Sequence, residues 1–315
     1  MNFWDALQTT IGYTLKKPPY PRKSSFAKKT ASAAEAEYSA PRSLIASMKF
    51  PFYWVDAFSD RVFRGNPAGV VPLAVWPEDA VMQQIAFENG LAETAFFVRT
   101  GADRFHLRWF TPTLEADLCG HATLAAAFTL FTQLDQAGDR VVFESRGGPL
   151  GVTKRTSTTL ELDFPSRPAV PLETPSISPG LLRAIGHRAP RAWLKVPGHL
   201  YYLAVFDTEV EVRAVRPDFP ALASLGDTRV IVTAPGRDCD FVSRFFAPGA
   251  GVPEDPVTGS AHCTLVPYWS AKLGKTALYA RQVSPRGGEL WCDLAGDRVK
   301  IAGSAVLYMR GEIVI

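Results

Sequence analysis

Two turns in the sequence combine a glycine with side chains that can exchange protons. One is Cys119-Gly120-His121 and the other is Thr258-Gly259-Ser260. Each turn leads into a run of small and apolar residues that predicts a buried helix. Glycine lets the backbone approach a ligand closely, and the first N–H groups of a helix have no intrahelical partner. Because the helix dipole adds to this effect, two such turns facing each other predict a clamp for a carboxylate.

The ionisable residues beside the two turns differ, so the chemistry they predict is not symmetric. The first turn offers Cys119 and His121, whereas the second follows Glu254 and Asp255. Moving a proton on a carbon next to a carboxylate needs an acid and a base with pKa values near the working pH. Glu93 is a further candidate, because it opens an otherwise apolar strand-like run where burial would raise its pKa. An exposed acid at a strand edge fits the same pattern.

An internal repeat connects the two turns. Residues 108–112 (RWFTP) precede the first turn as residues 244–248 (RFFAP) precede the second, and residues 145–150 match residues 285–290. The three offsets are 136, 139 and 140 residues, with the order preserved. This regularity indicates two homologous halves, joined by a proline-rich stretch that begins at Pro165.

The elements that would position these groups alternate between strands and single helices. Residues 52–58, 93–98 and 105–110 have the composition of strands. A helix is expected to open around Pro77 and to end at Asn89-Gly90, a common C-terminal cap. Because strand-rich stretches separate the helices, the order predicts an α+β fold rather than a doubly wound parallel sheet.

The composition favours a soluble protein that acts on small molecules. The 315 residues are 47% hydrophobic, and none of the apolar runs is long enough to cross a membrane. Of the net charge of +3, residues 1–47 carry +4, which leaves −1 for the rest and no basic surface for nucleic acid. Four cysteines without a CxxC pair favour free thiols in the cytoplasm. The scattered histidines have no metal-ligand spacing, so no metal is expected.

The first 47 residues differ from the remainder of the chain. They lack apolar periodicity and are predicted to be a disordered N-terminal extension. A targeting segment is the alternative, although two glutamates within it, Glu35 and Glu37, are unusual for a transit peptide.

Several segments together resemble the signature of the PhzF (phenazine biosynthesis-like) family. In the family's order they are GNPA at 65–68, ETAF at 93–96, LCGHATLA at 118–125, EDPVTGSAHC at 254–263 and SPRGGEL at 284–290. The resemblance implies the fold of diaminopimelate epimerase, with two pseudo-symmetric lobes that are each a curved, barrel-like β-sheet around a central α-helix. It places residues 48–165 and 300–315 in the N-terminal lobe and residues 166–299 in the C-terminal lobe. A homodimer is the expected assembly.

The resemblance also assigns roles to individual residues. Glu93 becomes the base and proton shuttle, Asp255 the second acid/base group, and His121 a hydrogen-bonding partner of the substrate. Substrate binding, including the backbone clamp on the carboxylate, falls to a second set: Asn66, Cys119, Gly120, Gly259 and Ser260.

The expected protein is therefore an isomerase that moves a proton on a small carboxylic acid without a metal or organic cofactor. Two alternatives remain open. One is a racemase or epimerase that uses Cys119 and Asp255 across the cleft, and the other is a non-catalytic member that binds a metabolite or a protein. Since the phenazine enzyme has no cysteine before its Gly-His pair, Cys119 leaves the substrate unnamed.

Overall fold

The computed structural model describes residues 48–173, 178–186 and 189–315, so the predicted extension at residues 1–47 lies outside the described residues. The elements of the N-terminal half are β1 (Lys49–Ala57), β2 (Asn66–Leu73), α2 (Asp79–Asn89), β3 (Glu93–Arg99), β4 (Arg104–Phe110), β5 (Glu115–Ala116), α3 (Gly120–Gln133), β6 (Arg140–Ser145), β7 (Gly148–Lys154) and β8 (Thr159–Pro165). Those of the C-terminal half are β9 (Val170–Leu172), α4 (Pro179–Ala184), β10 (Ala192–Lys195), β11 (Tyr201–Val205), α5 (Glu209–Ala214), α6 (Phe219–Ala223), β12 (Arg229–Pro235), β13 (Phe241–Ala247), the 3-10 turn η2 (Pro248–Ala250), β14 (Val252–Asp255), α7 (Gly259–Leu273), β15 (Ala277–Gln282), β16 (Gly288–Ala295) and β17 (Arg298–Val314). Among the helices described here, none combines the length and the apolar character needed to span a membrane.

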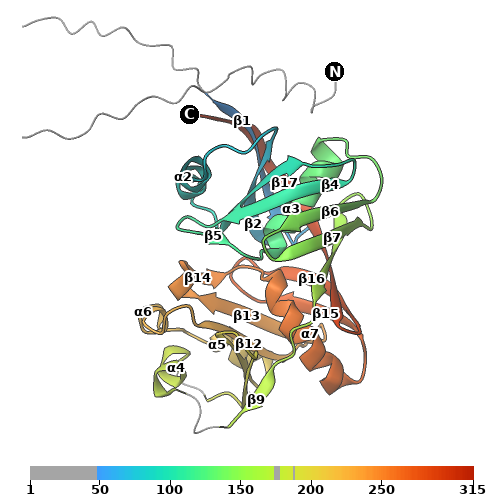
Figure 1. Ribbon diagram of the computed structural model, residues 1–315. Helices are drawn as coiled ribbons and strands as arrows, with labels where there is room; N and C mark the ends of the chain where they lie inside the picture. The colour runs from blue at the N-terminus through green and yellow to red at the C-terminus, as the bar shows by residue number, and fades with distance from the viewer. Residues whose placement is uncertain (1–47, 174–177, 187–188) are drawn as a thin grey trace, which may run out of the picture.

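The N-terminal lobe is a closed barrel around one helix. Its strands run β1-β2-β3-β4-β6-β7-β8-β17 and return to β1, with β2–β3 and β4–β6 parallel and the other pairs antiparallel. Every residue of α3 from Gly120 to Leu130 is buried. A helix that is apolar on all sides needs enclosure, and the barrel surrounds this helix (Figure 1).

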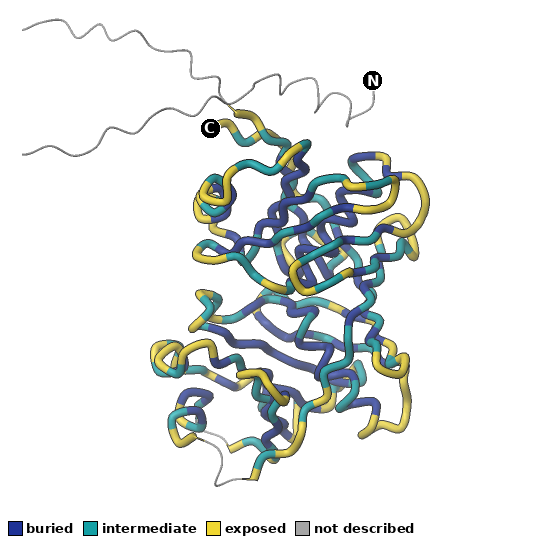
Figure 2. Tube along the Cα trace, in the orientation of Figure 1, coloured by how far each residue is buried: buried dark blue, intermediate teal, exposed yellow. Residues whose placement is uncertain are grey.

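The C-terminal lobe repeats this strand order around α7. Its strands run β9-β10-β11-β12-β13-β15-β16-β17, with β11–β12 and β13–β15 parallel. Side chains of α4, α5 and α6 form a second apolar core with β12 and β13. Figure 2 shows that the central strands of both lobes are buried while the loops between them are exposed. The predicted α+β fold with two pseudo-symmetric lobes is confirmed.

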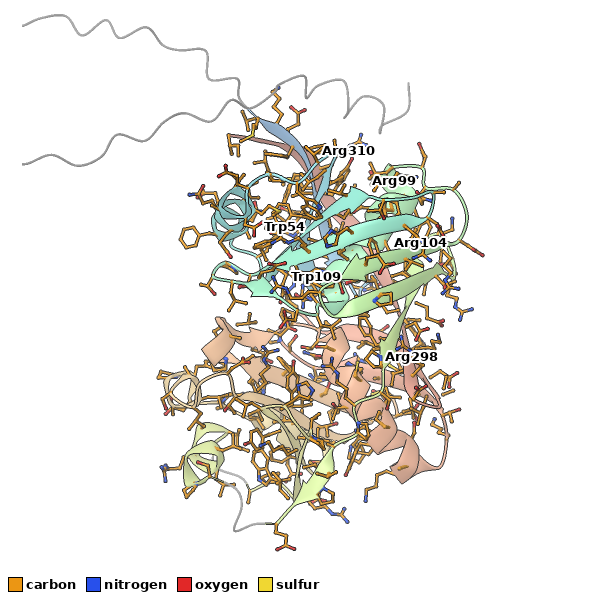
Figure 3. The ribbon with its side chains drawn as sticks, in the orientation of Figure 1. Trp54, Arg99, Arg104, Trp109, Arg298 and Arg310 are labelled. Atoms are coloured by element: carbon orange, nitrogen blue, oxygen red, sulfur yellow. The ribbon has the colours of Figure 1, made fainter. Side chains whose placement is uncertain are left out.

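The last strand, β17, belongs to both lobes. Its residues 298–304 pair with β8, and residues 298–302 also pair with β16 on the other side. From Ala305 onward it pairs with β1. Arg298, labelled in Figure 3 near the junction of the lobes, donates to Asp163 of β8 over 2.8 Å. A continuous sheet therefore connects the two lobes.

The N-termini of α3 and α7 meet where the lobes face each other. A Cβ added to Gly120 would lie 3.0 Å from the Cα of Gly259 and 3.3 Å from the ring of Phe164. A Cβ added to Gly259 would lie 3.3 Å from the Cα of Gly120. Because backbone atoms lie this close to both positions, a larger residue at either glycine requires the helices to shift by a few tenths of an ångström.

We expect Gly120→Ala to lower the free energy of unfolding by ~1–3 kcal/mol, the usual effect of overpacking a close contact. Gly311→Ala is the matched control, since nothing lies within 4 Å of a Cβ added there, and its effect should stay within ~0.5 kcal/mol. Urea denaturation of the two variants measures both values. Equal stabilities for the two variants would contradict the tight helix contact.

Candidate active site

A cavity of about 690 Å³ opens between the two lobes, above the contact of Gly120 with Gly259. The N-terminal lobe contributes the start of β3 and the turn before α3 to its walls. The C-terminal lobe contributes the end of β14, the turn before α7 and the starts of β11 and β12. A volume of this size accommodates a small organic ligand.

Both helices present uncapped N-termini to this cavity. The residue before α3, Cys119, and the residue before α7, Thr258, have extended backbones, and neither side chain caps its helix. The N–H groups of the first turns therefore remain available for an anion. The residues that carry them, Gly120, His121, Gly259 and Ser260, all line the cavity.

Glu93 reaches the cavity because it is the first residue of β3. Its Oε2 lies 3.2 Å from Nε2 of His121 without the alignment of a hydrogen bond, and no other described residue bonds to this oxygen. Burial, followed by the negative charge of Asp255, raises the pKa of Glu93 to about 8. A hydrogen bond with Cys119 and the charge of Arg229 act weakly in the opposite direction. The carboxyl group therefore exchanges its proton near neutral pH.

His121 and Cys119 are uncharged in this site. Burial lowers the pKa of His121 to about 3, so its imidazole is neutral, and its Nδ1 lies 3.5 Å from Sγ of Cys119. Burial, reinforced by the charge of Glu93, raises the pKa of the Cys119 thiol well above its ordinary value. Because only a thiolate is a strong base or nucleophile, Cys119 is poorly suited to abstract a proton.

Asp255, the last residue of β14, is also buried, but its carboxylate accepts hydrogen bonds. Thr258 Oγ1 donates over 2.5 Å and Asn66 Nδ2 over 2.6 Å. Burial raises the pKa of Asp255 to about 6, less than that of Glu93, because both hydrogen bonds favour the charged form. Two carboxyl groups in one cavity thus hold their protons with different strength, an arrangement that separates acid and base roles.

Asn66 was predicted to contact the substrate, but the structure places it behind the residues that line the cavity. It is fully buried and lies outside the cavity wall, and its Nδ2 also donates to the carbonyl of Val257 over 2.9 Å. Gln282 of β15, which sequence reasoning missed, has a similar position. Its Oε1 accepts from the Thr258 N–H over 2.8 Å, and its Nε2 donates to the Asp255 carbonyl over 2.7 Å. The two amide side chains fix the turn before α7.

Three of these residues could also hold a metal ion. The ligand atoms of Glu93, Cys119 and His121 lie within 4.8 Å of one another. Their spacing in the sequence matches no metal motif, so sequence reasoning missed this group. The donor set suits zinc, but a metal must displace the thiol proton, which burial and the Glu93 charge hold tightly.

Comparison with known proteins agrees with this geometry. Curated relatives of the chain are named as isomerases, and this class agrees with a two-lobed fold that carries acid/base groups in the cleft between the lobes. Residues 55–311 match the family described as phenazine biosynthesis-like protein (PhzC-PhzF), and the chain belongs to this family.

Three similar proteins illustrate the range of the match. An uncharacterized isomerase of Pseudomonas aeruginosa is 53% identical over 266 residues, which covers 84% of this chain and 99% of that protein. A PhzF family crystal structure from Enterococcus faecalis has 46% identity and a TM-score of 0.78, covering 84% and 99% of the two chains. A predicted epimerase of Pseudomonas aeruginosa, with 20% identity, a TM-score of 0.65 and coverage of 84% and 99%, shares the fold.

The raised pKa of Glu93 makes a prediction about stability. Since its folded-state pKa of about 8 exceeds its ordinary value of 4.5, the folded protein binds an extra proton between these two pH values. The stability associated with that proton is complete below pH 4.5 and is lost as the pH rises through 8. Glu93→Gln cannot lose this proton, so its stability relative to wild type should increase from pH 5 to about pH 8 and then level off.

Urea denaturation at pH 5, 7 and 9 measures this difference, with the exposed residue change Glu88→Gln as the control. The control should stay at a constant offset from wild type. A constant offset for Glu93→Gln as well would show that Glu93 titrates normally.

Proposed function

We propose that this chain is a cofactor-independent isomerase that moves a proton between two carbons of a small carboxylic acid. The observation that supports it most is the pairing of Glu93 with Asp255, two carboxyl groups of different pKa, above two uncapped helix N-termini. The helix ends suit the carboxylate of the substrate, and the carboxyl groups suit proton exchange on the carbon skeleton beside it.

Binding and chemistry use different groups in this proposal. The N–H groups at the starts of α3 and α7 hold the substrate carboxylate, and neutral His121 hydrogen-bonds to a polar group next to it. Because the carboxylate takes up negative charge from the neighbouring carbon, the same N–H groups stabilise the anion formed when a proton leaves.

Glu93 carries the proton. Its carboxylate removes a proton from the acidic carbon, leaving the electron pair delocalised over the unsaturated acid, and the resulting carboxylic acid returns that proton to another carbon of the same anion. The raised pKa of Glu93 makes it a stronger base than an exposed glutamate and keeps it close to the working pH. Asp255 is the second acid/base group of the site, and Asn66 and Thr258 orient its carboxylate.

Two further expectations belong to this proposal without contributing to the mechanism. All four cysteines are free, which fits a reducing cytoplasm. The homodimer remains an expectation from the family resemblance alone.

Glu93→Gln should lower turnover by roughly 10²–10⁴-fold, the usual contribution of a positioned general base. Affinity for the substrate should change little, because backbone N–H groups hold the carboxylate. Deuterium incorporation from D₂O into a panel of small unsaturated carboxylic acids, followed by NMR, measures both shift of the double bond and inversion at carbon.

The same assay separates the alternatives. Asp255→Asn should also be impaired, whereas Cys119→Ser and the control Glu88→Gln should retain most of the activity. Inversion at carbon with Cys119→Ser as the most damaging change would identify a racemase or epimerase instead. Binding of acids without any deuterium exchange would identify a non-catalytic member of the family.

Cofactor independence has its own test. Exhaustive dialysis against EDTA should leave the exchange rate unchanged, and added Zn²⁺ should not increase it. Stoichiometric metal in the purified protein, lost together with activity and restored by one metal ion per chain, would place a working metal at Glu93, Cys119 and His121.

A further inference from the structure

The two lobes can be aligned residue by residue where β3 and β12 pair with the next strand. Phe96 of β3 lies opposite Arg108 of β4, and Val232 of β12 lies opposite Arg244 of β13. Each of these arginines binds a glutamate of the short strand that follows: Glu115 for Arg108 and Glu254 for Arg244. The strand pairing and the ion pairs therefore give the same alignment of the two halves.

Within this alignment, the first residue of β12 corresponds to the first residue of β3. These residues are Arg229 and Glu93, each three positions before the paired residue named above. Both line the cavity. The C-terminal lobe thus places a cation where the N-terminal lobe places its acid/base group, which makes the two walls of the cleft chemically different.

Arg229 is held in place but still has donors to spare. Its Nε and Nη2 donate to the two carboxylate oxygens of Asp227 over 3.0 and 3.2 Å, and its Nη1 donates to the Tyr201 hydroxyl over 2.6 Å. A guanidinium has five N–H groups. These three bonds leave one N–H on each terminal nitrogen, the number that a carboxylate needs for bidentate binding.

Asp227, which also lines the cavity, pairs with Arg229, but the charge of Arg229 still acts inside the cavity. The Asp227 side chain is 58% exposed, so solvent screens its charge, whereas that of Arg229 is 32% exposed. The positive charge reaches the opposite wall, where it acts to lower the pKa of Glu93. A cation fixed on the wall opposite Glu93 favours a ligand with a second negative group.

Aromatic rings surround this part of the cavity. The rings of Tyr201 and Phe245 lie 6.0 Å apart, and that of His199 lies 6.0 Å from Tyr201. The guanidinium of Arg229 lies 5.1 Å from the Tyr201 ring. All four residues line the cavity, and such a wall favours a planar, unsaturated ligand.

We propose that Arg229 is a specificity-determining residue that binds a second carboxylate of the substrate, so that the substrate is a planar, unsaturated dicarboxylate. The first carboxylate occupies the paired helix N-termini, and in this respect the inference rests on the proposed function. With one carboxylate at each end, the carbon skeleton between them lies along the wall that carries Glu93.

Arg167 is the competing cation of the cavity. Its backbone N–H donates to the Cys263 carbonyl over 2.8 Å, which places the residue beside α7. Within the described residues, the Arg167 side chain forms no ion pair and no hydrogen bond. Because of its position, we assign its charge to the first carboxylate, so its removal should weaken mono- and dicarboxylates alike.

Benzoate and isophthalate test this assignment, since they share one planar ring and differ only in the second carboxylate. Neither acid has an acidic C–H to exchange, so binding is measured by calorimetry without turnover. Wild type should bind isophthalate at least tenfold more tightly than benzoate. Arg229→Gln should weaken isophthalate about 10–100-fold, the contribution of a charge-assisted pair, and benzoate less than threefold.

Three variants complete the design. Arg229→Lys should retain part of the preference, Arg167→Gln should weaken both acids equally, and Arg191→Gln, an exposed residue outside the cavity, should change neither. Melting temperatures identify any variant that fails to fold. If Arg229→Gln does not fold, the preference for isophthalate over benzoate is measured on Arg229→Lys and Asp227→Asn instead.

Equal affinities of wild type for the two acids, or an equal loss of both in Arg229→Gln, would overturn the inference. So would a selective loss of isophthalate in Arg167→Gln. Failure of Glu93→Gln to slow proton exchange would refute the proposed mechanism but leave these binding results standing, so the two proposals fail separately.

Discussion

The close approach of Gly120 to Gly259 is the contact on which the site depends. Each glycine begins a helix buried in its own lobe, so their contact sets the distance between the lobes as well as the distance between the helix ends. Two partial positive charges are brought to one point at the floor of the cleft. The carboxyl groups of Glu93 and Asp255 are then placed on either side of that point by the strands that surround the helices.

Burial alone would raise both carboxyl pKa values and leave the two groups equivalent. Hydrogen bonds account for part of the difference: Asp255 receives them from Thr258 and Asn66, whereas one oxygen of Glu93 has no such partner among the residues described. The negative charge of Asp255 accounts for another part, because it raises the pKa of Glu93 further. Asn66 and Gln282 therefore influence the chemistry without touching the cavity, since they hold the turn that carries Asp255. The two lobes have similar backbones, but the carboxylate of Asp255 in the C-terminal lobe accepts hydrogen bonds that one oxygen of Glu93 in the N-terminal lobe lacks.

Local patterns predicted the parts of the structure that depend on neighbouring residues. The helix expected near Pro77 begins at Asp79 and ends at Asn89 with Gly90 in the left-handed conformation, and the two glycine turns open buried helices as expected. Long-range contacts were not predictable in this way. Gln282 reaches the site from another strand, and no local pattern indicates that Asn66 faces Asp255 instead of the cavity. The position of Arg229 could have been predicted from the internal repeat. It lies 136 residues after Glu93, the same offset that relates Arg244 to Arg108.

The strand shared by the two lobes also constrains how the protein is made. The N-terminal barrel closes only when β17 inserts between β8 and β1, and the pairing of Lys49 with Val314 joins residues from opposite ends of the described chain. Contacts between residues this far apart form late and slow folding. During synthesis the first lobe remains an incomplete barrel with two open edges until β17 has left the ribosome. The cleft between the lobes therefore forms only after β17 is in place.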